Sequence, residues 1–471
     1  MAALLRSVFS VESLLPPSKR KGEIPTTKSA YRQLLQIAIP SVLELVLVSL
    51  VGSVDTMMVG SLGAEAIAAV GLVGQPRMLL LCIFFALNIG VTAVVARRKG
   101  EGRQDTANEA LRTALVLIAG LGVVVTAIAL PLARPLMWLA GAKEDTVDLA
   151  QTYFTIVSSV LPLNALTLCI NAAQRGVGNT RITMYVNIVS NAVNIVFNYL
   201  LIGGNLGFPR MGVAGAALAT LIGFVAGFLL SVYSVASRKS AGRFLHISIH
   251  NSWKPRRDSL QAIGKVGGNA MLEQVALRIG FFVYARLVAD LGTIPLAAHH
   301  ICMQFLNLSF SFADGLGVAG TSLVGQMMGR GRPDLSMMYG KVAQRVAMVM
   351  ALCLASVLVT LRYPLVGLFT SGAEVTALAV QVMLVVAAFQ PLQASSVVIS
   401  GCLRGAGDTR YVAGIMLVCV ALIRPILTYV GIHWIGLGLL GAWCASLIDM
   451  SLRLTCVYRR FAGGKWFAIK V

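Results

Sequence analysis

Four asparagine side chains follow one another at helical spacing inside a stretch of sequence that is otherwise almost wholly apolar. The stretch reads NIVSNAVNIVFNYLLI, residues 187–202, and its amides belong to Asn187, Asn191, Asn194 and Asn198. Steps of four, three and four residues place all of them on one stripe of an α-helix. Amides supply carbonyl oxygens and N–H donors, so we expect the stripe to face polar partners.

Two carboxylates share one face of an earlier apolar segment. Asp55 lies in LVGSVDTMMVG, with no lysine or arginine within one helical turn, and Glu44 precedes it by eleven residues. The two groups would be about 16 Å apart along a helix, too far for one site but suited to one polar pathway. An acid inside a membrane span costs about 3 kcal/mol on insertion scales, so Asp55 is a candidate for cation binding. A carboxyl held neutral by a local hydrogen bond is the alternative.

Two more acids lie in apolar stretches of the second half. Glu273, in GGNAMLEQVALRIG, is either a cation-attracting or protonatable group or the partner of Arg278 in an internal ion pair. Asp314, in FADGLGVAG, fits cavity lining and a structural role equally well. Pairing with acids, or extension towards the membrane surface, explains three arginines within spans at least as well as substrate contact does. These are Arg77, Arg286 and Arg424.

The amino-acid composition indicates whether these polar groups are surrounded by water or by a membrane. Of 471 residues, 57% are hydrophobic and 12% are charged, about half the charged share of a soluble domain. Most of the chain therefore has no water to face, and the sequence predicts a membrane protein with many spans. The net charge of +20 is bunched in connections such as RRKGEGR (97–103) that recur after every second span, which is the positive-inside pattern. We infer cytoplasmic termini and attraction to anionic membrane lipid, not to nucleic acid.

Other kinds of chemistry are not indicated. The eight cysteines are scattered singly, without the spacing of a disulfide framework or of a Cys/His metal site. The sequence has no Walker A motif for ATP hydrolysis, and no cluster of histidines and acids that would indicate an integral-membrane enzyme. We therefore expect no catalytic residues and no cofactor.

The apolar segments predict twelve membrane-spanning helices. They cover residues 33–59, 65–95, 107–133, 146–173, 182–203, 213–236, 260–289, 295–324, 335–361, 374–402, 411–431 and 438–460. The predicted divisions are an N-terminal cytoplasmic segment (1–32), a first lobe (33–236), a cytoplasmic linker (237–259), a second lobe (260–460) and a cytoplasmic tail (461–471). The first 30 residues fit an amphipathic lead-in helix better than a signal peptide, because Arg6 and Glu12 interrupt their apolar run.

The two halves of the chain repeat one another. The matched pairs, each 229 positions apart, are Glu44 with Glu273, GEGRQD (100–105) with GRGRPD (329–334), and RGVGNTR (175–181) with RGAGDTR (404–410). Near the ends, GVAGAA (212–217) and GLLGAW (438–443) match at an offset of 226. Six helices per repeat give both halves the same orientation, so we expect two lobes related by a pseudo-twofold axis along the membrane normal. Such duplications are typical of secondary transporters.

Several motifs occur together and in order. They are IPSVLE, SVDTMMVGSLGAEAIAAVGL, RRKGEGR, FNYLLI, LGTIPLAAHHI, VGQMMGRGRPD and the duplicated RGVGNTR and RGAGDTR. In these motifs the chain, from about residue 30 to its end, resembles the multidrug and toxic compound extrusion (MATE) transporters of prokaryotic type. The resemblance implies an all-α integral membrane protein with twelve helices in two six-helix lobes. It also implies export of organic cations or other amphipathic compounds in exchange for H+ or Na+.

The resemblance also implies a set of ion-coupling residues. In the family, an Asp on the first helix faces two Asn on the fifth helix and a Thr on the sixth; the matching positions here are Asp55, Asn194, Asn198 and Thr220. A carboxylate with amide carbonyls and a hydroxyl is hard-oxygen ligation, which suits Na+ or a proton-bound water network. Hydrogen bonding between helices is the alternative for the amides.

The remaining candidates are less specific. For Asn187 and Asn191, packing and cavity lining are equally expected. Position 55 corresponds to Tyr284 in the second half, so the carboxylate–amide set occurs in one lobe only. Some branches of the family use an acid on the tenth helix, where this chain has Gln393, which argues against that second-lobe coupling site.

Together these observations predict a cation-coupled efflux antiporter of the cell (inner or plasma) membrane. Its partners would be a small-molecule substrate, an organic cation or amphipathic drug-like compound, and membrane lipid, and we expect a monomer. Two alternatives stay open: a flippase for lipid-linked precursors, whose cavity would be more cationic, and a dedicated metabolite exporter of the same superfamily.

Overall fold

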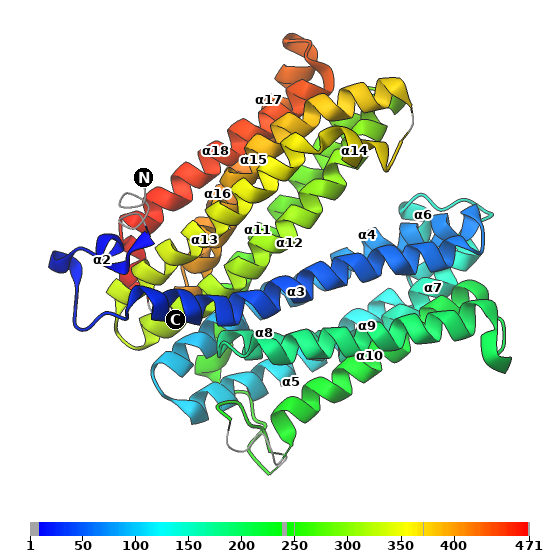
Figure 1. Cartoon of the computed structure of the whole chain (residues 1–471). Coiled ribbons are helices and arrows are strands. Elements are labelled where there is room, and N and C mark those ends of the chain that lie inside the picture. The colour runs from blue at the N-terminus through cyan, green and yellow to red at the C-terminus, as the bar shows by residue number, and fades with distance from the viewer. Residues whose placement is uncertain (1–8, 238–242, 249, 371, 470–471) are drawn as a thin grey trace. The chain divides into compact units, whose positions relative to one another are not determined.

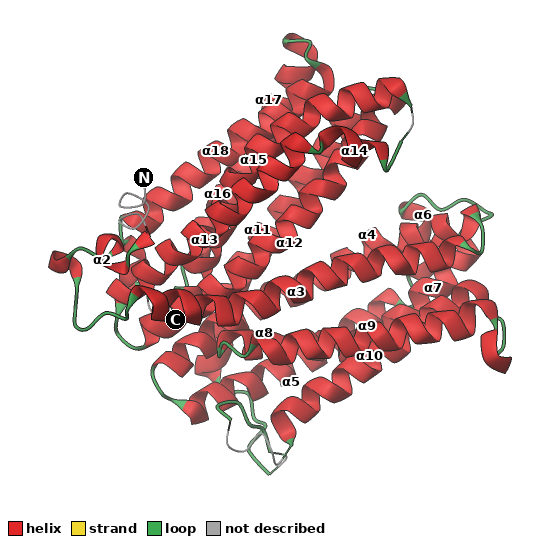
Figure 2. Cartoon of the chain, in the orientation of Figure 1, coloured by secondary structure: helices red, strands yellow, loops and turns green. Residues whose placement is uncertain are grey.

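The structure is a computed structural model that describes residues 9–237, 243–248, 250–370 and 372–469 (Figure 1). Over these residues it is helical and contains no strand (Figure 2). Parts of three predicted segments lie outside the described residues, namely 1–8 of the N-terminal segment, 238–242 and 249 of the linker, and 470–471 of the tail. The predicted all-α fold class is confirmed.

Long helices dominate both halves of the described chain. In the first half they are α3 (Thr27–Gly60), α4 (Ala64–Gly100), α5 (Gln104–Ala129), α7 (Val147–Ser159) with α8 (Leu161–Gly176), α9 (Thr180–Gly203) and α10 (Gly212–Ala236). In the second half they are α11 (Arg257–Ala289), α12 (Thr293–Gly329), α13 (Pro333–Thr360), α15 (Ala373–Gly405), the run Thr409–Trp434 and α18 (Gly438–Ala462). Shorter helices are α2 (Val11–Leu14), α6 (Ala133–Leu139) and α14 (Arg362–Gly367).

Ten of the described helices are long and apolar enough to cross a membrane, or eleven if α7 and α8 form one bent span. The long helix outside that set is α11, which carries Lys265 and Glu273 along its length. With α11 there are twelve long helical segments among the described residues, as the sequence predicts.

The helix expected over 146–173 is broken, which corrects its prediction as one continuous element. α7 and α8 are bent by 51° relative to one another. Pro162 lies in the first turn of α8, where the missing N–H of proline costs nothing but prevents the preceding turn from continuing. Its repeat partner Pro391 lies inside the continuous helix α15.

The eleventh helical run contains π-helical turns. It consists of α16 (Thr409–Met416), a π-segment (Leu417–Ile423), α17 (Arg424–Tyr429) and a second π-segment (Val430–Trp434). Pro425 lies in the first turn of α17 and cannot donate a hydrogen bond to the turn before it. A π-turn accommodates an extra residue, which rotates the following turns relative to a regular helix.

The described chain divides into two compact units. The first-half unit is Leu43–Gly267, and the second-half unit is Met1–Val42 with Gly268–Val471. The divisions fall inside α3 and inside α11, so the first turns of α3 belong to the second-half unit.

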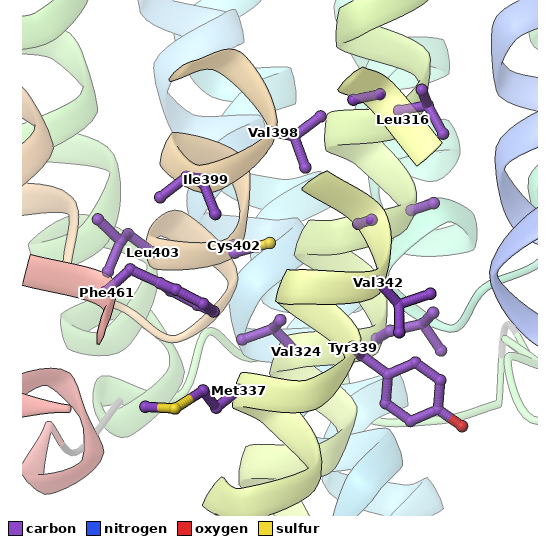
Figure 3. Close-up of a cluster of buried hydrophobic side chains, with 14 of the residues drawn as sticks. Leu316, Val324, Met337, Tyr339, Val342, Val398, Ile399, Cys402, Leu403 and Phe461 are labelled. Carbon is purple, nitrogen blue, oxygen red and sulfur yellow. The ribbon is translucent and has the colours of Figure 1, made fainter. Parts of the chain in front are cut away.

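The core of the second-half unit is packed by α12, α13, α15 and α18 (Figure 3). Val324, Val342 and Leu403 are fully buried there, and the ring of Phe461 lies against Gly340, where a Cβ would be 2.3 Å from the ring. Val11, Leu14 and Leu15 of the N-terminal segment are buried in the same cluster.

The N-terminal segment is fixed to this unit by polar contacts as well. In the part of the predicted lead-in segment that the structure describes, from residue 9 on, the helix α2 is a single turn, and a short 3-10 turn follows at Pro17–Lys19. The Lys21 backbone N–H donates to Asp334 Oδ2 (3.0 Å), and Lys341 Nζ donates to the Leu14 carbonyl (2.9 Å). These contacts attach residues 11–21 to the first three turns of α13.

Close contacts within each unit repeat at the offsets that the sequence shows. Thr92 Oγ1 donates to the Ala172 carbonyl (3.1 Å), and Thr321 Oγ1 donates to the Gly401 carbonyl (2.8 Å), 229 positions on. A Cβ on Gly215 would lie 2.5 Å from the Leu201 carbonyl, and a Cβ on Gly441 would lie 2.5 Å from the Gly431 carbonyl. The two glycines are 226 positions apart (441 − 215), and the two carbonyls are 230 positions apart (431 − 201). The carbonyl offset exceeds the usual 229 by one because the preceding π-turn accommodates one extra residue.

Candidate functional site

Asp55 of α3 lies among amides of α9 in the first-half unit. Asn198 Nδ2 donates to Asp55 Oδ1 at 2.8 Å. In the orientation that satisfies both ends of its amide, Asn194 donates to Asp55 Oδ1 (2.8 Å) and Oδ2 (3.2 Å) and accepts from the Thr220 backbone N–H (3.2 Å). The structure thus brings together the four residues that the sequence analysis grouped: Asp55, Asn194, Asn198 and Thr220.

Close packing of α9 on α10 positions these amides. Gly223 of α10 allows the approach, because a Cβ there would lie 2.8 Å from the Ser190 carbonyl and 3.0 Å from Asn194 Cβ. Thr220, one turn earlier, donates to the Ala216 carbonyl (3.0 Å), which fixes its hydroxyl beside Asn194.

The site combines a carboxylate with uncharged oxygen ligands. Asp55 is half-buried and forms no ion pair with the residues that the structure describes, so its negative charge is uncompensated by the protein. Asn198 Oδ1 is buried without a hydrogen-bond partner among those residues. A carboxylate beside a spare amide oxygen and a hydroxyl offers the hard oxygen ligands that Na+ or a protonated water takes. Groups of three or more His, Cys, Asp or Glu that would hold a transition metal are absent from the described chain.

Glu44 belongs to a separate cluster, in which the glutamate itself is 2% exposed. Its carboxylate accepts from the Arg175 guanidinium, from Thr183 Oγ1 (2.7 Å) and from Asn187 Nδ2 (2.7 Å). The predicted single stripe of amides is therefore divided between two carboxylates. Asn187 donates to Glu44, whereas Asn194 and Asn198 donate to Asp55. Asn191 lies between the clusters and makes no hydrogen bond to any described residue through its side chain.

Glu273 occupies the equivalent cluster of the second-half unit. Arg404 Nη2 donates to its Oε1 (2.6 Å) and Arg404 Nε to its Oε2 (3.3 Å). Both glutamates thus pair with an arginine 131 residues further on. The sequence analysis considered Arg278 as the partner within the same helix, and the partner in the structure is Arg404. Such doubled buried pairs indicate a scaffold that joins helices rather than an open binding site.

Asp314 and Gln393 do not assemble a second carboxylate–amide site. Asp314 of α12 is half-buried and lies close enough to Arg404 to interact with its charge. Gln393 of α15 is 2% exposed, and its Oε1 has no hydrogen-bond partner among the described residues.

Replacing Glu273 by glutamine is expected to affect stability rather than ion coupling. The change leaves the Arg404 guanidinium beside a neutral group in a buried position, which costs about 3 kcal/mol. Thermal unfolding in detergent measures the loss, and transport by the folded fraction measures coupling. The double variant Glu273→Leu/Arg404→Met removes both charges and should regain most of the stability. An altered ion dependence in a Glu273→Gln protein of parental stability would contradict the scaffold role.

A third buried charge cluster confirms that Arg424 pairs with an acid, although the sequence did not identify the other two members, Asp449 and Arg453. Arg424 Nη2 and Nε donate to Asp449 Oδ2 (2.7 and 3.0 Å), and Arg453 Nη2 donates to the same oxygen (2.9 Å). These side chains are 5%, 0% and 7% exposed for Arg424, Asp449 and Arg453, respectively. The spacing Asp449–Arg453, four apart inside an apolar span, is the signal that would have found two of the three.

This charged triad stands where the first-half unit holds its Asp55 site. Offsets of 229, 230 and 226 relate Asp55 to Tyr284, Asn194 to Arg424, and Gly223 to Asp449. In the first-half unit Gly223 lies against Asn194, and in the second-half unit Asp449 pairs with Arg424. The Arg424 guanidinium also lies 5.9 Å from the Tyr284 ring centre. At the location equivalent to the Asp55 site, the second-half unit therefore contains a positively charged side chain, Arg424.

Known proteins resemble this chain over most of its length. The family model described as MatE matches residues 40–200 and 270–430, one copy in each half. A Thermotoga maritima protein named "probable multidrug resistance protein NorM" is 27% identical over 447 residues, which cover 95% of this chain and 94% of that protein. A Shewanella oneidensis protein of the same name is 31% identical over 386 residues, with 80% and 82% covered.

Solved structures show the same fold. The crystal structure of a MATE in the bent conformation matches with a TM-score of 0.85 at 23% identity, covering 93% of this chain and 96% of that one. An outward-facing MATE transporter of the MOP superfamily matches with the same TM-score, covering 93% and 97%.

Proposed function

This chain belongs to the multidrug and toxic compound extrusion family, and from that premise we propose a secondary active antiporter that exports organic cations or amphipathic compounds in exchange for H+ or Na+. As a member of that family it is a membrane transporter and not an enzyme. The multidrug resistance names of the Thermotoga and Shewanella relatives support a drug-like substrate.

The Asp55 site is the observation that carries the proposal. It is the buried acid cluster of the first-half unit that lacks a basic partner among the described residues, whereas Glu44 is paired with Arg175. An acid without an internal counter-ion inside a span gains most from binding an external cation. Binding neutralises the carboxylate and lets the amides of Asn194 and Asn198 exchange their orientation around it.

The transport cycle then alternates between a state with an ion bound at Asp55 and a state without one. With H+ or Na+ at Asp55, the first lobe adopts a shape that releases substrate outward; after the ion leaves towards the cytoplasm, substrate binds again. An H+ or Na+ gradient equivalent to about 100 mV supplies about 2.3 kcal/mol per ion, enough for about fifty-fold accumulation. The lobes 33–236 and 260–460, the cytoplasmic termini and the monomeric state are part of the proposal, and the positive-inside asymmetry supports the orientation.

Reconstitution in liposomes tests the function and identifies the ion. Proteoliposomes with a fluorescent organic cation are exposed separately to a Na+ gradient and to a pH gradient of equal driving force. We expect substrate to move against its own gradient under one of them and to stop when that gradient is collapsed by an ionophore. Movement without either gradient, or only of an anionic lipid-linked compound, would contradict antiport of organic cations.

A further inference from the structure

An apolar groove lies on the first-half unit, and none of its lining residues belongs to the Asp55 site. The groove has a volume of about 350 Å³ and is lined by residues of α5, α8 and α10 and by two residues of the linker. Its lining residues are Leu115, Val116, Ala119, Leu166, Ile170, Phe228, Val232, Val235, Ala236, Ile247 and Trp253. The tryptophan N–H is the one polar side-chain group in this lining.

The described part of the linker is attached to the helices around the groove. The Ile247 N–H donates to the Val235 carbonyl (2.8 Å), and the His246 N–H donates to Asn108 Oδ1 (2.9 Å). Ile247 is buried, whereas Trp253 keeps 39% of its surface exposed. Trp253 is thus held at the rim of an apolar groove, next to the basic residues Lys254 and Arg256.

Arg112 supplies a positive charge on the same face of α5. It precedes Leu115, Val116 and Ala119 by three, four and seven residues, which places it one turn before the groove on the same helix face. Its Nε is buried without a partner, and it forms no ion pair with a described residue. The neighbouring acid, Glu109, is paired with Arg256 at 3.2 Å.

We propose that this groove binds an anionic phospholipid, with an acyl chain along the apolar lining and the phosphate at Arg112. An acyl chain needs no polar partner, which fits a lining that offers almost none, whereas a drug-like ligand needs several placed polar groups. A tryptophan at the rim is typical of the membrane interface. The basic charges of Arg112 and Lys254 beside the groove select an anionic headgroup, and the positive-inside asymmetry assigns it to the cytoplasmic leaflet.

Quenching of Trp253 fluorescence tests the proposal. The full-length protein is placed in phosphatidylcholine nanodiscs with an increasing fraction of dibrominated phosphatidylglycerol, whose bromines quench tryptophan on contact. The difference between the parent and Trp253→Phe isolates Trp253 from the other four tryptophans. We expect its quenching to saturate at a low fraction of this lipid, whereas dibrominated phosphatidylcholine quenches only in proportion to its abundance.

Variants separate the phosphate contact from the groove itself. Arg112→Gln should raise the half-saturating fraction about fivefold, the contribution of one basic residue at a membrane surface, and Arg112→Lys should retain most of the preference. Ala119→Phe fills the groove and should abolish the saturable quenching by dibrominated phosphatidylglycerol, leaving only quenching in proportion to lipid abundance. Arg330→Gln, an exposed arginine of the second-half unit, is the matched control and should match the parent. Equal curves for the two lipids in the parent, or an unchanged curve for Arg112→Gln, would overturn the proposal.

Discussion

Replacing Asp55 by asparagine is expected to abolish ion-driven transport and to leave the protein folded. Asparagine has the shape of aspartate and can still accept from Asn198, whose Nδ2 lies 2.8 Å from Asp55 Oδ1, but it carries no charge that H+ or Na+ could neutralise. Without a coupled ion the substrate only equilibrates across the membrane, so we expect accumulation to fall from about fifty-fold to about one-fold. The measurement is uptake of a fluorescent organic cation into proteoliposomes under an imposed gradient.

Two companion variants make this result specific. Asp148→Asn removes an exposed acid of the same unit, 75% exposed and paired with Arg134, and should transport like the parent. Asn198→Ala keeps the carboxylate but removes its donor and the spare oxygen beside it, so we expect weakened ion dependence with residual transport. Accumulation at the parental level by Asp55→Asn would mean that the carboxylate and its amides are structural.

Replacing Asp449 by asparagine should destabilise the second-half unit more than any other single charge removal described above. Asp449 Oδ2 accepts from both Arg424 and Arg453, and all three side chains are at most 7% exposed. Without the carboxylate, two guanidiniums stay buried side by side, and removing one member of a buried ionic cluster costs about 3–5 kcal/mol. We expect the value to lie near the upper end, as a reduced midpoint of thermal unfolding and a reduced yield of folded protein.

The control and the rescue for this prediction come from the same unit. Asp290→Asn breaks an exposed pair with Arg286, in which the side chains are 47% and 70% exposed, and solvent screening should keep its effect within about 0.5 kcal/mol. The triple variant Asp449→Leu/Arg424→Met/Arg453→Met removes all three charges and should recover most of the stability, because apolar replacements of a buried cluster pack well. Parental stability of Asp449→Asn would show that the cluster is hydrated rather than buried.

The amino-acid sequence was sufficient to predict the Asp55 site, because helical spacing places Asn194 and Asn198 on one face and the family resemblance adds Asp55 and Thr220. Spacing alone could not place Asn187. It defines which face of a helix a residue occupies, but not which residue of the neighbouring helix lies at the same depth. Asn187 is at the depth of Glu44, which the predicted common stripe did not distinguish.

The ion pairs of Glu44 and Glu273 were harder to predict from the sequence. A contact over 131 residues depends on how helices pack, so Arg175 and Arg404 stand out in the sequence only as the first arginines of the repeated RGVGNTR and RGAGDTR motifs. The repeat held the missing signal, because both glutamates and both arginines recur at the same offset of 229. The π-turn that rotates Arg424 into position has only Pro425 as a local sign, and proline is compatible with several irregularities.

The π-segment at Leu417–Ile423 has a consequence for the stoichiometry of exchange. Together with the repeat offsets it sets Arg424 at the position that corresponds to Asn194, beside an acid that replaces a glycine. After an ancestral duplication, one half would have kept a binding site for an ion that can dissociate. The other half would have acquired, at the equivalent position, the positive charge of an arginine side chain, which cannot dissociate. On the proposed mechanism, only one ion is then exchanged per turnover. Export of a monovalent cation would be electroneutral, and its rate would follow the ion gradient and not the membrane voltage.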